Sequence, residues 1–88
     1  MERTLQIVNK LGLHARAAAK LVTLANKYKC EIRATKDGRE VSGKSIMGVM
    51  MLAAAKGSRV IFRAEGPDAE KALDAIEALV ARKFDEAA

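Results

Sequence analysis

The clearest structural signal in the chain is an alternating stretch, Arg59-Val60-Ile61-Phe62-Arg63-Ala64-Glu65. Val60, Phe62 and Ala64 fall on one face of this stretch, and its charged residues fall on the other. This alternation is typical of a strand in an antiparallel sheet that buries one face and exposes the other. We therefore expect a sheet that is solvated on one side and covered on its second side.

Three further short runs share the same period and bring the sheet to four strands. They are residues 4–8, residues 30–35 and a brief run around Val41. Asp37-Gly38 lies between the last two runs and is typical of a type I′ hairpin turn, because that turn needs positive φ at both residues. Cys30 and Phe62 are expected to face the core, where a lone thiol behaves as a small apolar side chain.

Three segments show the helical period instead: residues 15–28, 45–55 and 69–84. Ser45 is a good N-cap and Lys56-Gly57 is a typical end signal for the second helix, while Gly66-Pro67-Asp68 marks the start of the third. The residues expected to face inward are Ala18, Leu21, Leu24, Ala25, Tyr28, Val49, Leu52, Ala53, Leu73, Ile76, Leu79 and Val80. The order β-α-β-β-α-β-α predicts an α+β fold, an open-faced two-layer sandwich with a four-stranded antiparallel sheet covered on one face by three helices.

Composition limits the classes of protein that this chain can belong to. Its 88 residues are 50% hydrophobic and 31% charged, which favours one globular domain over residues 1–88. One cysteine and one histidine exclude an intramolecular disulfide, a cysteine-based metal site and a multi-histidine metal site, so no metal or cofactor is expected. The net charge of +5 favours an acidic partner, whether protein, phosphate or nucleic acid.

The sequence also predicts where the protein works. The longest apolar run, residues 46–55, is ten residues long, whereas a membrane span needs about 20. The first residues contain no apolar signal-peptide region, and an odd number of thiols suits a reducing compartment. We expect a cytoplasmic protein without membrane insertion.

The only histidine lies where the first strand ends and the first helix begins. Gly12 permits a tight backbone path just before His14, which places His14 at or next to the helix N-cap. The free N–H groups of a first helical turn attract phosphate, and Arg16 adds a fork of donors for phosphate oxygens. Because a neutral imidazole nitrogen is a nucleophile near pH 7, this arrangement suits a residue that carries a phosphoryl group. The alternative from the residues alone is an ordinary surface histidine.

Two motifs resemble those of a known family. Residues 11–18, Leu-Gly-Leu-His-Ala-Arg-Ala-Ala, resemble the active-site motif of the HPr family, the histidine phosphocarriers of the bacterial phosphoenolpyruvate-dependent phosphotransferase system. Residues 43–50, Gly-Lys-Ser-Ile-Met-Gly-Val-Met, resemble the regulatory serine segment of the same family. Length and element order extend the resemblance over the whole chain.

The resemblance implies a phosphoryl carrier rather than an independent enzyme. His14 would accept the phosphoryl group on Nδ1 from enzyme I and pass it to A-domain proteins of permeases or of a regulatory branch, with Arg16 assisting. Ser45 would be phosphorylated by HPr kinase/phosphorylase, although its bare pattern is equally that of an N-cap. A monomer is expected. The resemblance leaves open whether the chain serves sugar transport or the nitrogen-related branch.

The expected partner-binding residues are Ala17, Lys20, Ile46, Met47 and Met50. Ala17 stands where the family motif usually has proline, and the helix should form with either residue. The apolar residues 46, 47, 49–52 cannot all face the sheet from one short helix, so some are expected to form an adaptable docking surface. Loose packing in the core is the alternative reading of the same pattern.

Two other functional classes remain as alternatives. The charge and the four-stranded sheet are compatible with a small nucleic-acid-binding module. Against it, the chain has only two Phe and one Tyr, and no aromatic pair is expected on the open face for base stacking. A regulatory relative that uses only the serine is disfavoured, because such proteins lack the histidine.

Overall fold

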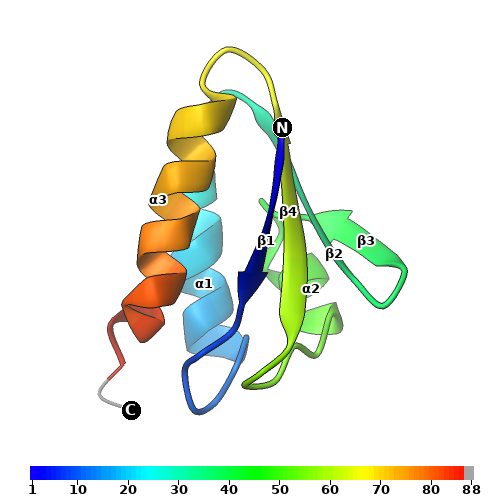
Figure 1. Ribbon diagram of the computed structural model, residues 1–88, viewed down its shortest axis with the longest axis vertical. Coiled ribbons are helices and arrows are strands. Elements are labelled where there is room, and N and C mark those ends of the chain that lie inside the picture. Colours follow the sequence, from blue (N-terminus) through cyan, green and yellow to red (C-terminus); the bar gives the residue numbers. More distant parts are fainter. Residues whose placement is uncertain (87–88) are drawn as a thin grey trace.

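The computed structural model describes residues 1–86, and its elements follow the predicted order. They are β1 (Glu2–Gln6), α1 (Ala15–Ala25), β2 (Glu31–Lys36), β3 (Arg39–Ser42), α2 (Ile46–Met51), β4 (Arg59–Glu65), α3 (Ala69–Ala81) and a 3-10 helix, η1 (Lys83–Asp85). The strands pair antiparallel in the order β1-β4-β2-β3. Figure 1 shows α1 and α3 side by side on one face of the sheet, and α2 contacts α1 and β3. The predicted open-faced α+β sandwich is confirmed.

Alternation along β4 divides the sheet into a buried and a solvated face, as expected. Val60, Phe62 and Ala64 are completely buried. Phe62 lies opposite Ala34 of β2, which leaves room for its ring between the sheet and the helices. Burying one such ring contributes about 1.5–3 kcal/mol, so the inward-facing side chains of β4 anchor the core.

The hairpin and the start of α3 also agree with the sequence. Asp37 and Gly38 both have positive φ, 51° and 80°, as a type I′ turn requires. Asp68 precedes α3, but its carboxylate does not cap that helix. It accepts the backbone N–H groups of Lys29 and Cys30, each at 2.9 Å, and so ties the start of β2 to the start of α3.

The first two helices end earlier than their periodicity predicted. α1 ends at Ala25, because Asn26 donates from its side chain to the Val22 carbonyl and the next residues form shorter turns. α2 ends at Met51 rather than at residue 55. Ala53 adopts a φ of +50° and lies on the surface, so the prediction that it faces the core is wrong; Ala54 is buried instead.

The loop before β4 and the bounds of β1 also differ from the prediction. Lys56-Gly57 does not end α2; the Gly57 N–H donates to the Ile7 carbonyl at 2.7 Å and holds the loop before β4 against β1. β1 spans Glu2–Gln6 rather than residues 4–8, and Leu5 and Ile7 are both buried.

The end of α3 differs most from the prediction. The helix stops at Ala81, and Lys83, Phe84 and Asp85 all have φ near +60°. Left-handed geometry costs about 1–2 kcal/mol per residue, so this turn needs compensating contacts. Phe84 supplies one, because its ring is completely buried.

Within residues 1–86, no helix has both the length and the apolar character that crossing a membrane demands.

Candidate functional site

A tight loop between β1 and α1 places His14 at the start of the helix. Gly12 has a φ of +66°, and a Cβ at that position would lie 2.3 Å from the Ala54 carbonyl oxygen. The neighbouring Leu13 N–H donates to the same carbonyl at 2.9 Å. Only glycine fits this close backbone approach, which confirms the expected unusual path before His14.

His14 is the N-cap residue of α1, in the predicted position. Its backbone is extended, its carbonyl accepts the Ala18 N–H at 2.8 Å, and its side chain does not cap the helix. Among the hydrogen bonds within residues 1–86, none uses the N–H groups of Ala15, Arg16 or Ala17 as donors. These groups and the positive end of the helix dipole are therefore available to an anion beside the imidazole.

The imidazole has a partner that the sequence did not suggest. His14 Nε2 lies 2.5 Å from Oε2 of Glu86, and Glu86 Oε1 accepts a hydrogen bond from Asn9 Nδ2 at 3.1 Å. The same Asn9 nitrogen donates to the Gly12 carbonyl at 2.8 Å. His14 is consequently half-buried, with 29% of its side chain exposed.

The environment of Glu86 keeps its carboxylate ionised. The hydrogen bond with His14 lowers the pKa of Glu86 most, and the bond from Asn9 and the charges of His14 and Arg16 add to this effect; burial opposes it. Glu86 follows the predicted third helix and is separated from His14 by 72 residues, so no local pattern could have indicated the pair.

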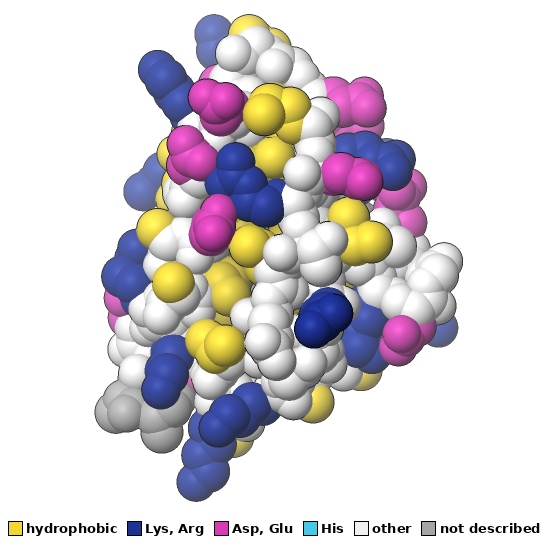
Figure 2. All heavy atoms as spheres, in the orientation of Figure 1, with side chains coloured by type: hydrophobic (Ala, Val, Ile, Leu, Met, Phe, Trp, Pro, Cys, Tyr) yellow, Lys and Arg dark blue, Asp and Glu magenta, His cyan; other side chains and the backbone are white. Residues whose placement is uncertain are grey.

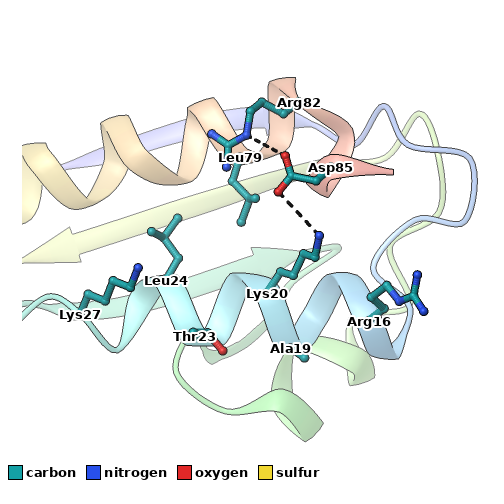
Figure 3. A pocket seen from close by; sticks show the side chains of 9 residues that line it. All are labelled: Arg16, Ala19, Lys20, Thr23, Leu24, Lys27, Leu79, Arg82 and Asp85. Atoms are coloured by element: carbon teal, nitrogen blue, oxygen red, sulfur yellow. Dashed lines mark hydrogen bonds and ion pairs between the residues drawn. The ribbon is translucent and has the colours of Figure 1, made fainter. Parts of the chain in front are cut away.

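Arg16 and Lys20, both expected at the site, lie in different environments. Arg16 is exposed and forms no ion pair within residues 1–86. Lys20 Nζ donates to the Phe84 carbonyl at 3.0 Å and lies 3.6 Å from Asp85, so it joins α1 to η1. Figure 3 shows Asp85 between Lys20 and Arg82, with Arg16 pointing away from them. The donors of Arg16 are therefore unoccupied within residues 1–86, whereas those of Lys20 are engaged by η1.

Arg16 and Lys20 also line a groove of about 420 Å³ between α1 and the end of α3. Its remaining lining residues are Ala19, Thr23, Leu24, Lys27, Leu79, Arg82 and Asp85. The hydrogen bond from Arg82 is the main cause that lowers the pKa of Asp85. Figure 2 shows Lys and Arg side chains gathered at the lower end of the molecule, where the β1–α1 loop lies in Figure 1. On the face that Figure 2 shows, this end of the molecule is thus predominantly basic.

The second sequence motif forms α2 and exposes an apolar surface. Ser45 is exposed and is the N-cap, and its hydroxyl accepts the Gly48 N–H at 3.1 Å. Val49 is buried, whereas Ile46, Met47 and Met50 are exposed, Met47 by 75%. Met51 is exposed as well, as the crowding of apolar residues in this segment allowed. Leu11 in the β1–α1 loop is a further exposed apolar residue, which the sequence did not assign to a surface role.

One expected contact residue is misplaced. Ala17 is completely buried, because it occupies the inward-facing third position of α1. Its side chain is therefore unavailable to a partner in this structure, and the assignment of Ala17 to the partner-binding set is wrong.

Comparison with known proteins places this arrangement in a family. Residues 1–82 match the family described as "PTS HPr component phosphorylation site". The chain belongs to the HPr family. Among HPr relatives, the phosphocarrier protein HPr of Cupriavidus necator is 51% identical over 98% of this chain and 97% of its own. A phosphocarrier protein NPr of Shewanella violacea is 47% identical over 99% of this chain and 96% of its own.

Solved HPr structures show the same fold. HPr-C-His from Thermoanaerobacter tengcongensis superposes with a TM-score of 0.96 and 44% identity, over 100% of this chain and 99% of that one. A second structure from that organism, an HPr dimer, has a TM-score of 0.80 and 45% identity over 98% of this chain and 99% of its own. HPr-fold proteins thus include a dimeric form.

Proposed function

We propose that this HPr-family protein is a phosphocarrier that accepts a phosphoryl group on His14 from enzyme I and passes it to A-domain proteins of the phosphotransferase system. The observation that carries the proposal is the position of His14 as N-cap of α1. His14 directly precedes the unpartnered N–H groups of the first turn, and Arg16, which forms no ion pair within residues 1–86, is two residues further on.

The transfer needs a nucleophile and a site for negative charge. The lone pair of His14 Nδ1 attacks phosphorus, the bond from phosphorus to the donor atom breaks, and its electron pair stays with the donor. Negative charge on the phosphoryl oxygens is stabilised by the first-turn N–H groups, by the helix dipole and by the guanidinium of Arg16. Transfer to an acceptor repeats the same step with the roles reversed.

The docking surface in this proposal is the apolar side of α2. Ile46, Met47 and Met50 expose flexible apolar side chains, which adapt to partners of different shape. The net charge of +5 steers acidic partners to the site, and Lys20 belongs to the same basic end of the molecule. Enzyme I and the A-domain proteins are the partners that this surface serves, and the protein acts in the cytoplasm as a monomer.

Ser45 is the proposed regulatory site, with HPr kinase/phosphorylase as the modifying enzyme. Its hydroxyl is exposed at the N-terminus of α2, where a phosphate is electrostatically favourable. Because Ile46 and Met47 follow directly, that charge would lie inside the proposed docking surface.

The nitrogen-related branch is the second candidate, and the NPr relative of Shewanella violacea favours it. The choice depends on the donor. Phosphorylation rates should be measured with the enzyme I of the sugar branch and, in parallel, with its nitrogen-branch counterpart; the donor with the higher kcat/KM identifies the branch.

The central test uses phosphoenolpyruvate and enzyme I. We expect one added phosphate that is labile to acid, detected by mass spectrometry, and its transfer to an A-domain protein. Absence of the label with both donors would contradict the phosphocarrier proposal. Light scattering of the same samples would reveal a dimer.

A further inference from the structure

We propose that Glu86 is a positioning residue for phosphoryl transfer: its carboxylate holds the Nε2 proton of His14, leaves Nδ1 as the nucleophile, and balances the positive charge that the ring acquires. This inference rests on the proposed function of His14. It assigns a role to the chain beyond α3, outside the two motifs at residues 11–18 and 43–50.

The geometry restricts the imidazole at one nitrogen only. Glu86 Oε2 lies 2.5 Å from Nε2 of His14, and within residues 1–86 no hydrogen bond involves Nδ1. A neutral imidazole next to a carboxylate donates its proton to that carboxylate, because the alternative tautomer would oppose a lone pair to a negative charge. The contact therefore favours the tautomer with the proton on Nε2 and the lone pair on Nδ1.

The carboxylate is itself held in place from two sides. Glu86 Oε1 accepts from Asn9, a completely buried side chain whose amide nitrogen is also bonded to the Gly12 carbonyl. Only 14% of the Glu86 side chain is exposed. Because both oxygens have partners, rotation of the carboxylate would break the bond with Asn9 as well as the contact with His14.

The backbone before Glu86 follows a path that needs several anchors. Three consecutive residues, 83–85, have positive φ, and this left-handed turn redirects the chain from the end of α3 toward the β1–α1 loop. The buried ring of Phe84 and the bond from Lys20 Nζ to the Phe84 carbonyl hold the turn. Unfavourable backbone geometry that is maintained in this way is typical of sites with a functional constraint.

The charge balance of the reaction gives the carboxylate its role. When Nδ1 forms a bond to phosphorus, the proton on Nε2 remains, so the ring becomes a cation. Glu86 then faces that cation across the existing hydrogen bond, as the buried aspartate does behind the histidine of a catalytic triad. On transfer to the acceptor, the N–P bond breaks, its electron pair returns to Nδ1 and the ring becomes neutral again.

The test compares Glu86→Ala and Glu86→Gln with the unmodified chain and with Glu70→Gln. Glu70 is exposed at the start of α3 and loses the same charge without any contact to His14, so it is a matched control. Single-turnover phosphorylation by enzyme I is measured over a range of enzyme I concentrations. The 15N shifts of the His14 ring report the tautomer independently of any transfer.

We expect Glu86→Ala to lower the maximal transfer rate about tenfold while the KM for enzyme I changes less than about twofold, because the carboxylate acts on the ring rather than on docking. The maximal transfer rate of Glu86→Gln should lie between those of Glu86→Ala and the unmodified chain, since the amide oxygen still accepts the Nε2 proton but carries no charge. Both ring nitrogens should shift toward the averaged values of exchanging tautomers in Glu86→Ala. Glu70→Gln should match the unmodified chain in every measurement.

Two failures remain distinguishable. If the unmodified chain is phosphorylated on His14 and Glu86→Ala has the same rate and the same ring shifts, the positioning role is overturned and the proposed function stands. If the unmodified chain accepts no phosphate, the proposed function fails and the inference fails with it. An increase in the KM for enzyme I without a decrease in the maximal transfer rate of Glu86→Ala would also overturn the inference, because it would make Glu86 a docking residue.

Discussion

Glu86 and His14 come together at 2.5 Å although most of the chain lies between them. The contact closes the β1–α1 loop against the turn after α3, with Asn9 bonded to the same carboxylate. It joins a charged group and the proposed phosphoryl acceptor in one small network.

The Glu86 contact should make folding stability depend on pH in the acid range. The pKa of Glu86 is lower in the folded protein than in an unfolded chain, so its contribution is fully present above the unfolded value of about 4.3 and is lost as pH falls through the folded pKa. Glu86→Gln should flatten the decline of Tm between neutral and acid pH. A decline as steep as that of the unmodified chain would contradict this linkage. Glu65→Gln, at the exposed end of β4 and without an ion pair within residues 1–86, serves as the control.

His14→Ala should abolish the acid-labile phosphate. The side chain is half-buried and its main contact is with Glu86, so the fold should persist and circular dichroism should be unchanged. Mass spectrometry after incubation with phosphoenolpyruvate and enzyme I checks the result. Continued labelling of this variant would place the acceptor on another residue.

Arg16→Ala should slow the transfer without removing the acceptor. The guanidinium is exposed and forms no ion pair within residues 1–86, so its loss should leave the packing intact. Because the variant lacks a donor to the phosphoryl oxygens, its transfer rate should fall by about tenfold or more. Arg59→Ala, an exposed arginine at the start of β4, is the matched control. Equal rates for the two variants would reduce Arg16 to a surface cation.

Ala17→Pro should fold and gain about 0.4–1 kcal/mol in the free energy of unfolding, because proline restricts the unfolded chain. Ala17 lies in the first turn, where its N–H has no acceptor within residues 1–86, so proline removes no hydrogen bond there. Chemical denaturation measures the change. A marked loss of stability would indicate that the buried position has no room for the ring.

Ser45→Asp should have opposite effects on stability and on transfer. A negative charge at the N-terminus of α2 is favourable by about 0.3–1 kcal/mol, so the Tm should not fall. The same charge lies beside the exposed Ile46 and Met47, where burial against a partner costs desolvation. The KM for enzyme I should therefore rise.

Ser45→Ala removes the N-cap of α2 without adding charge to the proposed docking surface. It should lose about 1 kcal/mol of stability through the missing bond to the Gly48 N–H, with a normal KM for enzyme I. If Ser45→Asp melts early and transfers normally, Ser45 acts as an N-cap alone.

The sheet, the inward faces of the helices and the position of His14 at a helix start all follow from local sequence patterns. Alternation along residues 59–65, the Asp37-Gly38 turn and the glycine before His14 are local signals, because each follows from backbone geometry within a few residues. The family motifs are local as well. The position of His14 at a helix start and of Ser45 at another could therefore be predicted without coordinates.

The surroundings of those residues depend instead on long-range packing. The burial of Ala17, the early end of α2 at the left-handed Ala53, and the contacts of Lys20 with η1 all depend on how elements pack against one another. The pairing of Glu86 with His14 depends on a turn of three positive-φ residues that is stabilised by the buried Phe84. Such a turn has no propensity of its own, because left-handed backbone is unfavourable in isolation and persists only where long-range contacts offset its cost.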